Sequence, residues 1–358
     1  MKKGLLEFLI ISSIFGSIFG VGIVSGQEAL QMFIETPFPT APKIAGYVIL
    51  LMIVAFVILD YSAMIKPKSF VDIIVKKNNV LKLAVQFFFV LLSFVGLTLM
   101  FAGAGSVLNG VTGANVFIGS LILSIFICII GIGGSQAILK LFNFAVPLVI
   151  VICLGTAMYG LFNPNIVILK SALIKVEYST LSYFLPILYV FYCASLLVTV
   201  LVPIASRIRH RKVIARGTIA TGIIFFLASS AVCFALIKFQ TTVEYTDLPM
   251  LEVARYLSPV LGGIYLVALV CGIISSPSAI IFGMINFFST FDNKYLKNRK
   301  IVVPILCLLA LLASQVGFSK IIALAVPTIG SISMLICVTI IINYIRTLRN
   351  DGFKDERY

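Results

Sequence analysis

Long apolar runs separated by short polar segments are the feature that most constrains the fold of this chain. Each run is about 20 residues long, the length of α-helix that crosses the hydrocarbon core of a bilayer. Because α-helices satisfy their own backbone hydrogen bonds in lipid, we expect an all-α integral membrane protein. A chain that is 61% hydrophobic and 11% charged could not cover a water-soluble globule. Ten spans are predicted, at 5–33, 42–64, 82–108, 115–135, 140–162, 183–205, 216–237, 260–288, 300–316 and 321–345.

The basic residues are distributed unevenly between the two ends of these spans. The net charge of +14 could suggest an anionic partner such as nucleic acid. If the N-terminus is cytoplasmic, however, 21 of the 27 Lys and Arg residues fall on the cytoplasmic side. This asymmetry predicts that both termini are cytoplasmic. The basic loop RIRHRK at 207–212 is then expected to face anionic lipid head groups.

Two halves of the chain share a weak internal similarity. KLFNFAVP at 140–147 and KIIALAVP at 320–327 are offset by 180 residues, and polar amphipathic connectors occupy corresponding places in each half. Five spans is an odd number, so the second half would enter the membrane from the opposite face, as an inverted repeat. We therefore expect a first repeat at 1–162, a second at 163–345 and a cytoplasmic tail at 346–358.

The first span, FGSIFGVGIVSGQEALQMF at 15–33, contains four glycines near its middle. Each glycine in a helix interior costs roughly 1 kcal/mol relative to alanine, so the segment is unlike a plain spanning helix. Ser25-Gly26-Gln27-Glu28 fits the S-x-x-E capping box, which marks the start of a helix. We expect unwinding around Gly20 to Val24, a new helix from Ser25, and a cavity beside the break, because irregular backbone is not tolerated against lipid.

A break of this kind predicts a binding site for a small solute. Exposed amides at the start of a half-helix attract a carboxylate, and small residues let the solute approach the backbone. The glycines could instead serve only close helix packing. Glu28 could carry a proton, contact a substrate amine or complete the capping box. A second, glycine-free break is predicted in the sixth span, near Cys193 to Ser195. The expected substrate-binding residues are Gly20, Gly22, Ser25, Gly26, Gln27, Glu28, Tyr192 and Ser195.

Main-chain carbonyls freed at the first break would also supply oxygen ligands for a small cation. We expect carbonyls near Gly16 and Phe19 to face the hydroxyls of Ser275 and Ser276 in the eighth span, forming a sodium site. The alternative is that these serines bond back to the preceding turn of their own helix, beside Pro277. No other metal site is expected.

Other polar residues carry weaker signals. Asp60 is expected to be an interfacial charge close to Lys66, and Asp247 with Arg255 to form a solvated or gate-capping connector. His210 is the only histidine and lies in a basic loop, so neither metal nor Ser-His chemistry is predicted, and the chain is not expected to be an enzyme. The seven cysteines are expected to be small apolar filler.

GSIFGVGIVSGQEALQMF resembles the first-helix signature of the YkvI-like bacterial membrane proteins, G-x-G-x-x-S-G-Q-E followed by an aromatic residue. The matching positions are Gly20, Gly22, Ser25 to Glu28, and Phe33. That family is similar to the amino acid-polyamine-organocation superfamily, which has the LeuT-type fold. The resemblance implies a ten-helix protein of the bacterial cytoplasmic membrane that transports an amino acid or a similar solute, coupled to Na⁺ or H⁺, with helices one and six broken. A non-transporting sensor or assembly protein that retains the fold is the alternative.

Overall fold

The computed structural model describes residues 3–75, 78–133, 135–163, 180–205, 208, 210–240, 246–291 and 293–350. All regular secondary structure within these residues is helical, so the all-α expectation is confirmed. In this part of the chain nine helical segments are long and apolar enough to cross a membrane. They are α4 (Thr40–Ile65), α5 (Asn79–Thr112), α6 (Val116–Gly133), α7 (Ser135–Phe162), α8 (Leu185–Ala205), α9 (Arg211–Phe239), α11 (Pro259–Phe288), α13 (Arg299–Ala313) continuing into η4 (Ser314–Val316), and α14 (Phe318–Asn350).

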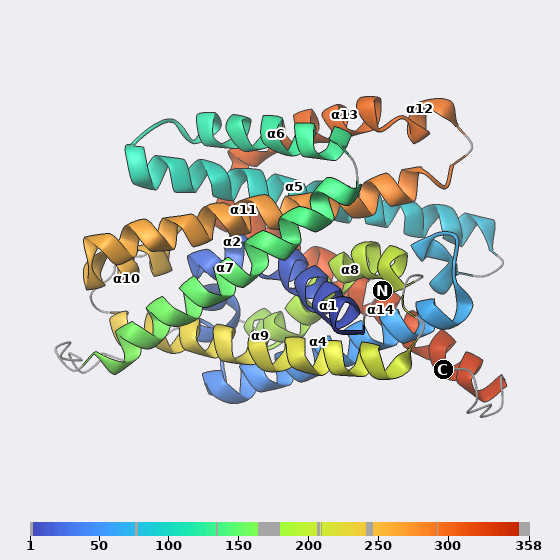
Figure 1. The fold of residues 1–358 in the computed structure, drawn as a ribbon, viewed down its shortest axis with the longest axis horizontal. Coiled ribbons are helices and arrows are strands. Elements are labelled where there is room, and N and C mark those ends of the chain that lie inside the picture. The colour runs from blue at the N-terminus through green and yellow to red at the C-terminus, as the bar shows by residue number, and fades with distance from the viewer. Residues whose placement is uncertain are drawn as a thin grey trace.

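The first predicted span is the interrupted one. It consists of α1 (Lys3–Ile18), α2 (Val21–Ser25), α3 (Gln27–Ala29) and the π-helical turn η1 (Leu30–Ile34). α1 packs against α7, α8, α9 and α11, so its end lies in the middle of the bundle (Figure 1). The interruption therefore faces protein on all sides, which is the condition under which broken backbone is tolerated at membrane depth.

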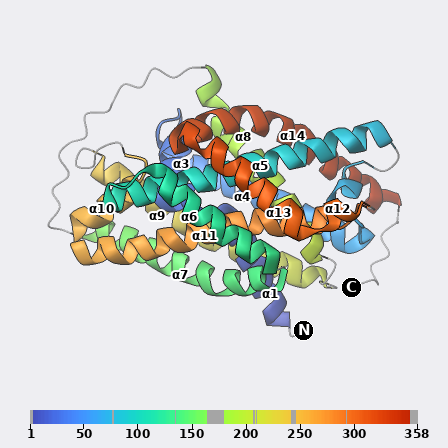
Figure 2. The ribbon, with the colours of Figure 1, turned by 90° about the horizontal axis from the view of Figure 1, so that it is seen from above.

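The long helices run along the longest axis of the molecule (Figure 1). Both termini lie toward one end, called here the terminal end, and α10 (Pro249–Leu257) lies at the other, called the α10 end. Figure 2 shows the same separation from above. α6 and α13 contact each other and α5, and form an outer layer away from α1.

Short elements connect the long helices. They are η2 (Phe70–Ile73), η3 (Thr180–Tyr183) and α12 (Lys294–Lys297). η2 is held by a true capping box, because the Ser69 hydroxyl accepts from the Val71 amide and Asp72 accepts from the Ser69 amide. Asp72 also pairs with Lys82 at 3.1 Å, which ties this connector to the start of α5.

The break predicted in the sixth span is wrong. α8 is one helix from Leu185 to Ala205, and it is buried along most of its length. Cysteine, alanine and serine at its centre are small, but none of them disfavours a helix as glycine does. The division into repeats at 1–162 and 163–345 stays a prediction, and the end of the predicted tail, from residue 351, lies outside the described residues.

Candidate functional site

The first interruption follows Ile18. The Phe19 amide still bonds to Phe15 O at 2.7 Å, but the Gly20 amide turns to Ile18 O at 2.8 Å, and Gly20 is extended with φ −88° and ψ −163°. Gly20 O then accepts from the Val24 amide at 3.0 Å, and the helix resumes as α2. The predicted break is confirmed, but it is shorter than the expected stretch of residues 20–24.

A second interruption lies at Gly26. This residue has φ +87° and ψ −4°, a left-handed conformation that glycine adopts without steric cost. The predicted capping box at Ser25 is wrong. The Ser25 hydroxyl donates to Gly22 O at 3.1 Å and accepts from the Gln27 amide at 3.2 Å, as the end of α2. Because Gly26 makes the turn, α3 begins after it rather than at Ser25.

Tyr265 of α11 stabilises the second interruption. Its hydroxyl donates to Val24 O at 2.6 Å, and its side chain is fully buried. A carbonyl near the end of a helix has no partner in the helix, so a buried one needs a side-chain donor. This residue was not among the predicted site residues, although a tyrosine inside an apolar span is itself a signal, because its hydroxyl usually finds a partner when buried.

Replacing Tyr265 with phenylalanine is expected to destabilise the protein. The substitution keeps the ring but leaves Val24 O buried without a donor, which costs about 1–3 kcal/mol. Thermal unfolding of the purified variant should therefore occur at a lower temperature than for the wild type. Tyr256→Phe is the matched control, since that ring is 55% exposed. Equal melting temperatures for all three proteins would contradict the assigned role.

Two of the predicted cation ligands lie together. The Ser276 hydroxyl of α11 donates to Gly16 O of α1 at 3.1 Å, across the packed face of the two helices. A Cβ at Gly20 would lie 2.9 Å from Ser276 Cβ, so the glycine permits this close approach. Ser275 instead donates to Gly272 O, 3.2 Å away in its own helix, which is the alternative considered for these serines. Phe19 contributes a buried ring that contacts Phe15 at 4.4 Å between centroids.

Glu28 turns back toward the first part of the break. Its carboxylate accepts from the Tyr189 hydroxyl of α8 at 2.6 Å, and the residue is 5% exposed. Its Cγ lies 2.5 Å from the place that a Cβ on Gly22 would occupy, so the missing side chain makes room for it. None of the four ion pairs between described residues includes Glu28. The structure thus joins Gly22 and Glu28 with α8.

Tyr189, the donor to this carboxylate, belongs to a group of packed aromatic rings from four helical segments. Tyr47 of α4 stacks on Tyr189 with centroids 5.2 Å apart and planes 15° apart, and Tyr192 also stacks on Tyr189, with centroids 6.4 Å apart. The Tyr47 hydroxyl is buried and has no hydrogen-bond partner among the described residues. We call the set the aromatic cluster, and its members are Phe33, Tyr47, Tyr189, Tyr192 and Phe225.

Two other predicted site residues point elsewhere. The Ser195 hydroxyl lies 4.0 Å from Cys337 Sγ of α14, away from the break. Gln27 donates from Nε2 to the Ser319 hydroxyl at 3.1 Å, toward the α10 end. Seven free cysteines agree with the expectation of apolar filler.

A polar network closes the bundle at the α10 end. Asp247 accepts from the Ser106 hydroxyl of α5 at 2.7 Å and from the Ser319 hydroxyl of α14, which in turn accepts from Gln27. The start of α10 covers the break directly, because Met250 Cγ lies 2.9 Å from the place of a Cβ on Gly26. We call this the Asp247 network. It favours the gate-capping reading of the connector over the solvated one.

A second network closes the terminal end. Asp60 of α4 accepts from the Tyr344 hydroxyl of α14 at 2.7 Å and pairs with Arg211 Nε of α9 at 3.3 Å. The expectation of an interfacial charge near Lys66 is wrong, because Asp60 is only 1% exposed and faces these two helices. We call this the Asp60 network. Its three members, Asp60, Arg211 and Tyr344, lie on three separate spans, so sequence spacing carried no signal for it.

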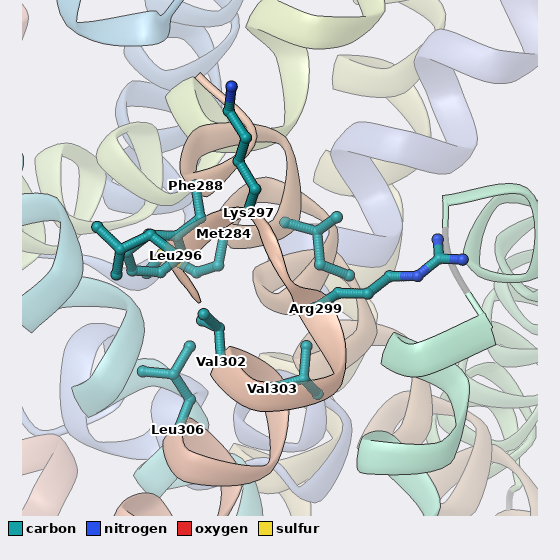
Figure 3. A pocket seen from close by; sticks show the side chains of 9 residues that line it. Met284, Phe288, Leu296, Lys297, Arg299, Val302, Val303 and Leu306 are labelled. Atoms are coloured by element: carbon teal, nitrogen blue, oxygen red, sulfur yellow. The ribbon is translucent and has the colours of Figure 1, made fainter. Parts of the chain in front are cut away.

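A small surface pocket lies away from the break, where α11, α12 and α13 meet (Figure 3). Its lining is mostly apolar, and Figure 3 shows the side chains of Lys297 and Arg299 extending outward from it. It contains none of the predicted site residues.

A comparison with solved structures identifies the fold of the chain. The structure is similar to that of MhsT, solved in complex with L-phenylalanine, with a TM-score of 0.65 and 16% identity, covering 93% of this chain and 87% of that one. The chain therefore has the LeuT fold, as the resemblance implied, and is a multi-pass membrane protein.

The sequence comparison agrees with the motif in the first span. The chain is 23% identical over 334 residues to the uncharacterized membrane protein YkvI of Bacillus subtilis (strain 168), covering 89% of this chain and 90% of the relative. The resemblance to YkvI-like membrane proteins is thus confirmed over nearly the whole chain. No protein-family model matches the sequence.

Proposed function

We propose that this protein is a secondary transporter that carries a small, amino-acid-like solute by alternating access. The observation that carries the proposal is the doubly interrupted first segment at the centre of the bundle. Its main-chain carbonyls at Gly16 and Val24 bond to side chains of α11, and Glu28 bonds to α8. Interrupted helices near the bilayer midplane are where secondary transporters hold solute and coupling ion.

The two polar networks supply the closures that alternating access requires. The Asp247 network lies on the α10 side of the break and the Asp60 network on the terminal side, and both are closed in this structure. Transport would open one network at a time. The excess of basic residues near the termini supports a cytoplasmic location for the terminal end, in the bacterial cytoplasmic membrane.

Solute recognition is proposed for the residues around the break. Gly20 and Gly22 pack directly against the side chains of Ser276 and Glu28, so a solute that displaces these side chains would reach the backbone of the break. The L-phenylalanine bound by MhsT supports an amino-acid-like solute of similar size for this chain.

Gradient-driven uptake tests the proposal directly. The purified protein in proteoliposomes should accumulate at least one member of a panel of amino acids and related amines when a sodium or proton gradient is imposed. Protein-free liposomes are the control. If no solute accumulates or exchanges under either gradient, transport is contradicted and a sensor or assembly role is favoured.

A matched pair of serines tests sodium coupling. The Ser276 hydroxyl donates to Gly16 O of α1, whereas the hydroxyl of its neighbour Ser275 donates to Gly272 O within α11. Ser276→Ala is therefore expected to remove any sodium dependence of uptake, because it deletes an oxygen beside the freed carbonyl, and Ser275→Ala is expected to retain it. Uptake measured against sodium concentration gives the comparison. Equal sodium dependence in both variants would contradict a cation site at this position.

A further inference from the structure

We infer, on the basis of the transport function proposed above, that the solute is an organic amine without a carboxylate beside its ammonium group. Glu28 would supply the negative charge that binds it. The inference rests on one juxtaposition: the Glu28 carboxylate lies against Gly22 at the break and bonds to Tyr189, a member of the aromatic cluster.

The Glu28 carboxyl group occupies the position beside Gly22 at the break. A substrate carboxylate was expected to approach the backbone at Gly22, but the chain's own carboxyl group already lies there. A second carboxylate in this buried space would be repelled, since like charges interact strongly where water is excluded. The helical piece that begins here, Val21–Ser25, has only five residues, so few aligned peptide dipoles offset that repulsion.

Glu28 is buried without a basic partner among the described residues. The residue is 5% exposed, and its carboxylate accepts one hydrogen bond, from Tyr189. A buried carboxylate is costly unless a positive group accompanies it. Lys43 does not provide one, because its ammonium donates to Thr36 O and Thr36 Oγ1 at 2.8 and 2.9 Å. No basic side chain among the described residues is paired with Glu28, so a bound cation or a proton would balance its charge.

The aromatic cluster favours an ammonium group over a bare proton as the partner of Glu28. Tyr189, whose hydroxyl bonds to the carboxylate, packs against the rings of Tyr47 and Phe33, and aromatic faces attract organic cations. The Tyr47 hydroxyl is buried without a partner and can accept a hydrogen bond from an ammonium N–H. A proton on Glu28 would use neither feature. An amine with an apolar body would use both, with its body among the rings.

Two matched pairs of solutes test the inference on the wild-type protein. 2-Phenylethylamine and L-phenylalanine differ by one carboxylate, as do tyramine and L-tyrosine. Thermal-shift titration and counterflow in proteoliposomes should show binding and exchange of at least one amine, with its amino-acid partner at least about tenfold weaker because its carboxylate is repelled by Glu28. If the amino acids bind and the amines do not, the inference is overturned while transport stands.

Glu28→Gln tests the residue itself. The amide keeps the size and the hydrogen bond but removes the charge, so the affinity for the amine should fall by roughly tenfold or more. Glu35→Gln, at the half-buried acid after η1, is the matched control and should bind like the wild type. Unchanged amine affinity in Glu28→Gln, with or without loss of the response to a pH gradient, would overturn the inference. Absence of any exchange by the wild type would contradict transport itself, and the inference with it.

Discussion

Alanine at position 22 is expected to reduce solute uptake by roughly ten- to hundredfold, the range that corresponds to losing one charge-assisted hydrogen bond. The new methyl group would fall within the Glu28 carboxyl group, so Glu28 must leave the break. Because a flexible side chain yields rather than the backbone, we expect a large loss of transport with a small loss of stability. Initial uptake rates and melting temperatures of the same preparation measure the two effects.

Gly46→Ala is the matched control for this substitution. Gly46 also lies in a membrane-spanning helix, and a Cβ placed on it meets no atom within 4 Å. It should therefore transport like the wild type. If Gly22→Ala also keeps wild-type uptake, the space between Gly22 and Glu28 is not part of the solute site.

Alanine at position 26 is expected to cause a large loss of stability, because it combines a backbone cost with a packing cost. The left-handed conformation costs a residue with a Cβ roughly 1–2 kcal/mol. The added methyl also meets Met250 Cγ at 2.9 Å and Leu236 Cδ1 at 3.0 Å, and such overpacking typically costs about 1–3 kcal/mol more. The melting temperature and the yield of folded protein should both fall.

Two other glycines separate the two contributions. Gly113 has φ +71° but no atom within 4 Å of its missing Cβ, so Gly113→Ala should show the backbone cost alone. Gly46→Ala has neither cost and replaces a glycine inside a helix, so its melting temperature should equal or exceed that of the wild type. The expected order of stability is Gly46→Ala, then Gly113→Ala, then Gly26→Ala. A melting temperature for Gly26→Ala at or above that of Gly113→Ala would show that α10 does not pack tightly on the break.

The interruption of the first segment was predictable because glycine is unfavourable inside a helix and lipid enforces helical backbone. Glycines 20 and 26 each mark a real departure from the helix, at residues where the backbone is extended or left-handed. The predicted start of the new helix at Ser25 was wrong, because a capping box is a short local pattern and α3 begins at Gln27. Gly26, in its left-handed conformation, ends α2 and precedes α3, so Ser25 does not cap the new helix.

The sixth span shows the opposite error. Small residues at its centre were read as a break by analogy with the first span, but α8 contains no residue that needs a non-helical backbone. The residue on α8 that matters most for the site is Tyr189, whose hydroxyl bonds to Glu28. A tyrosine in an apolar span signals that its hydroxyl needs a partner, without identifying that partner.

The closing networks could not be predicted from spacing. Asp247 bonds to serines on α5 and α14, and Asp60 to groups on α9 and α14, so each network joins segments far apart in the chain. Pairing of this kind depends on how the helices pack. The structure shows that Asp60 is 1% exposed, and a carboxylate buried to this degree needs polar partners inside the protein.

The most direct test of the central claim is a density map of the protein in lipid nanodiscs, determined with and without a solute that exchanges in proteoliposomes. The account predicts that the first segment is interrupted at Gly20 and Gly26 in both maps. It also predicts added density between Gly22, Glu28 and the ring of Tyr189 when the solute is present. A continuous helix through this segment, or solute bound away from it, would contradict the account.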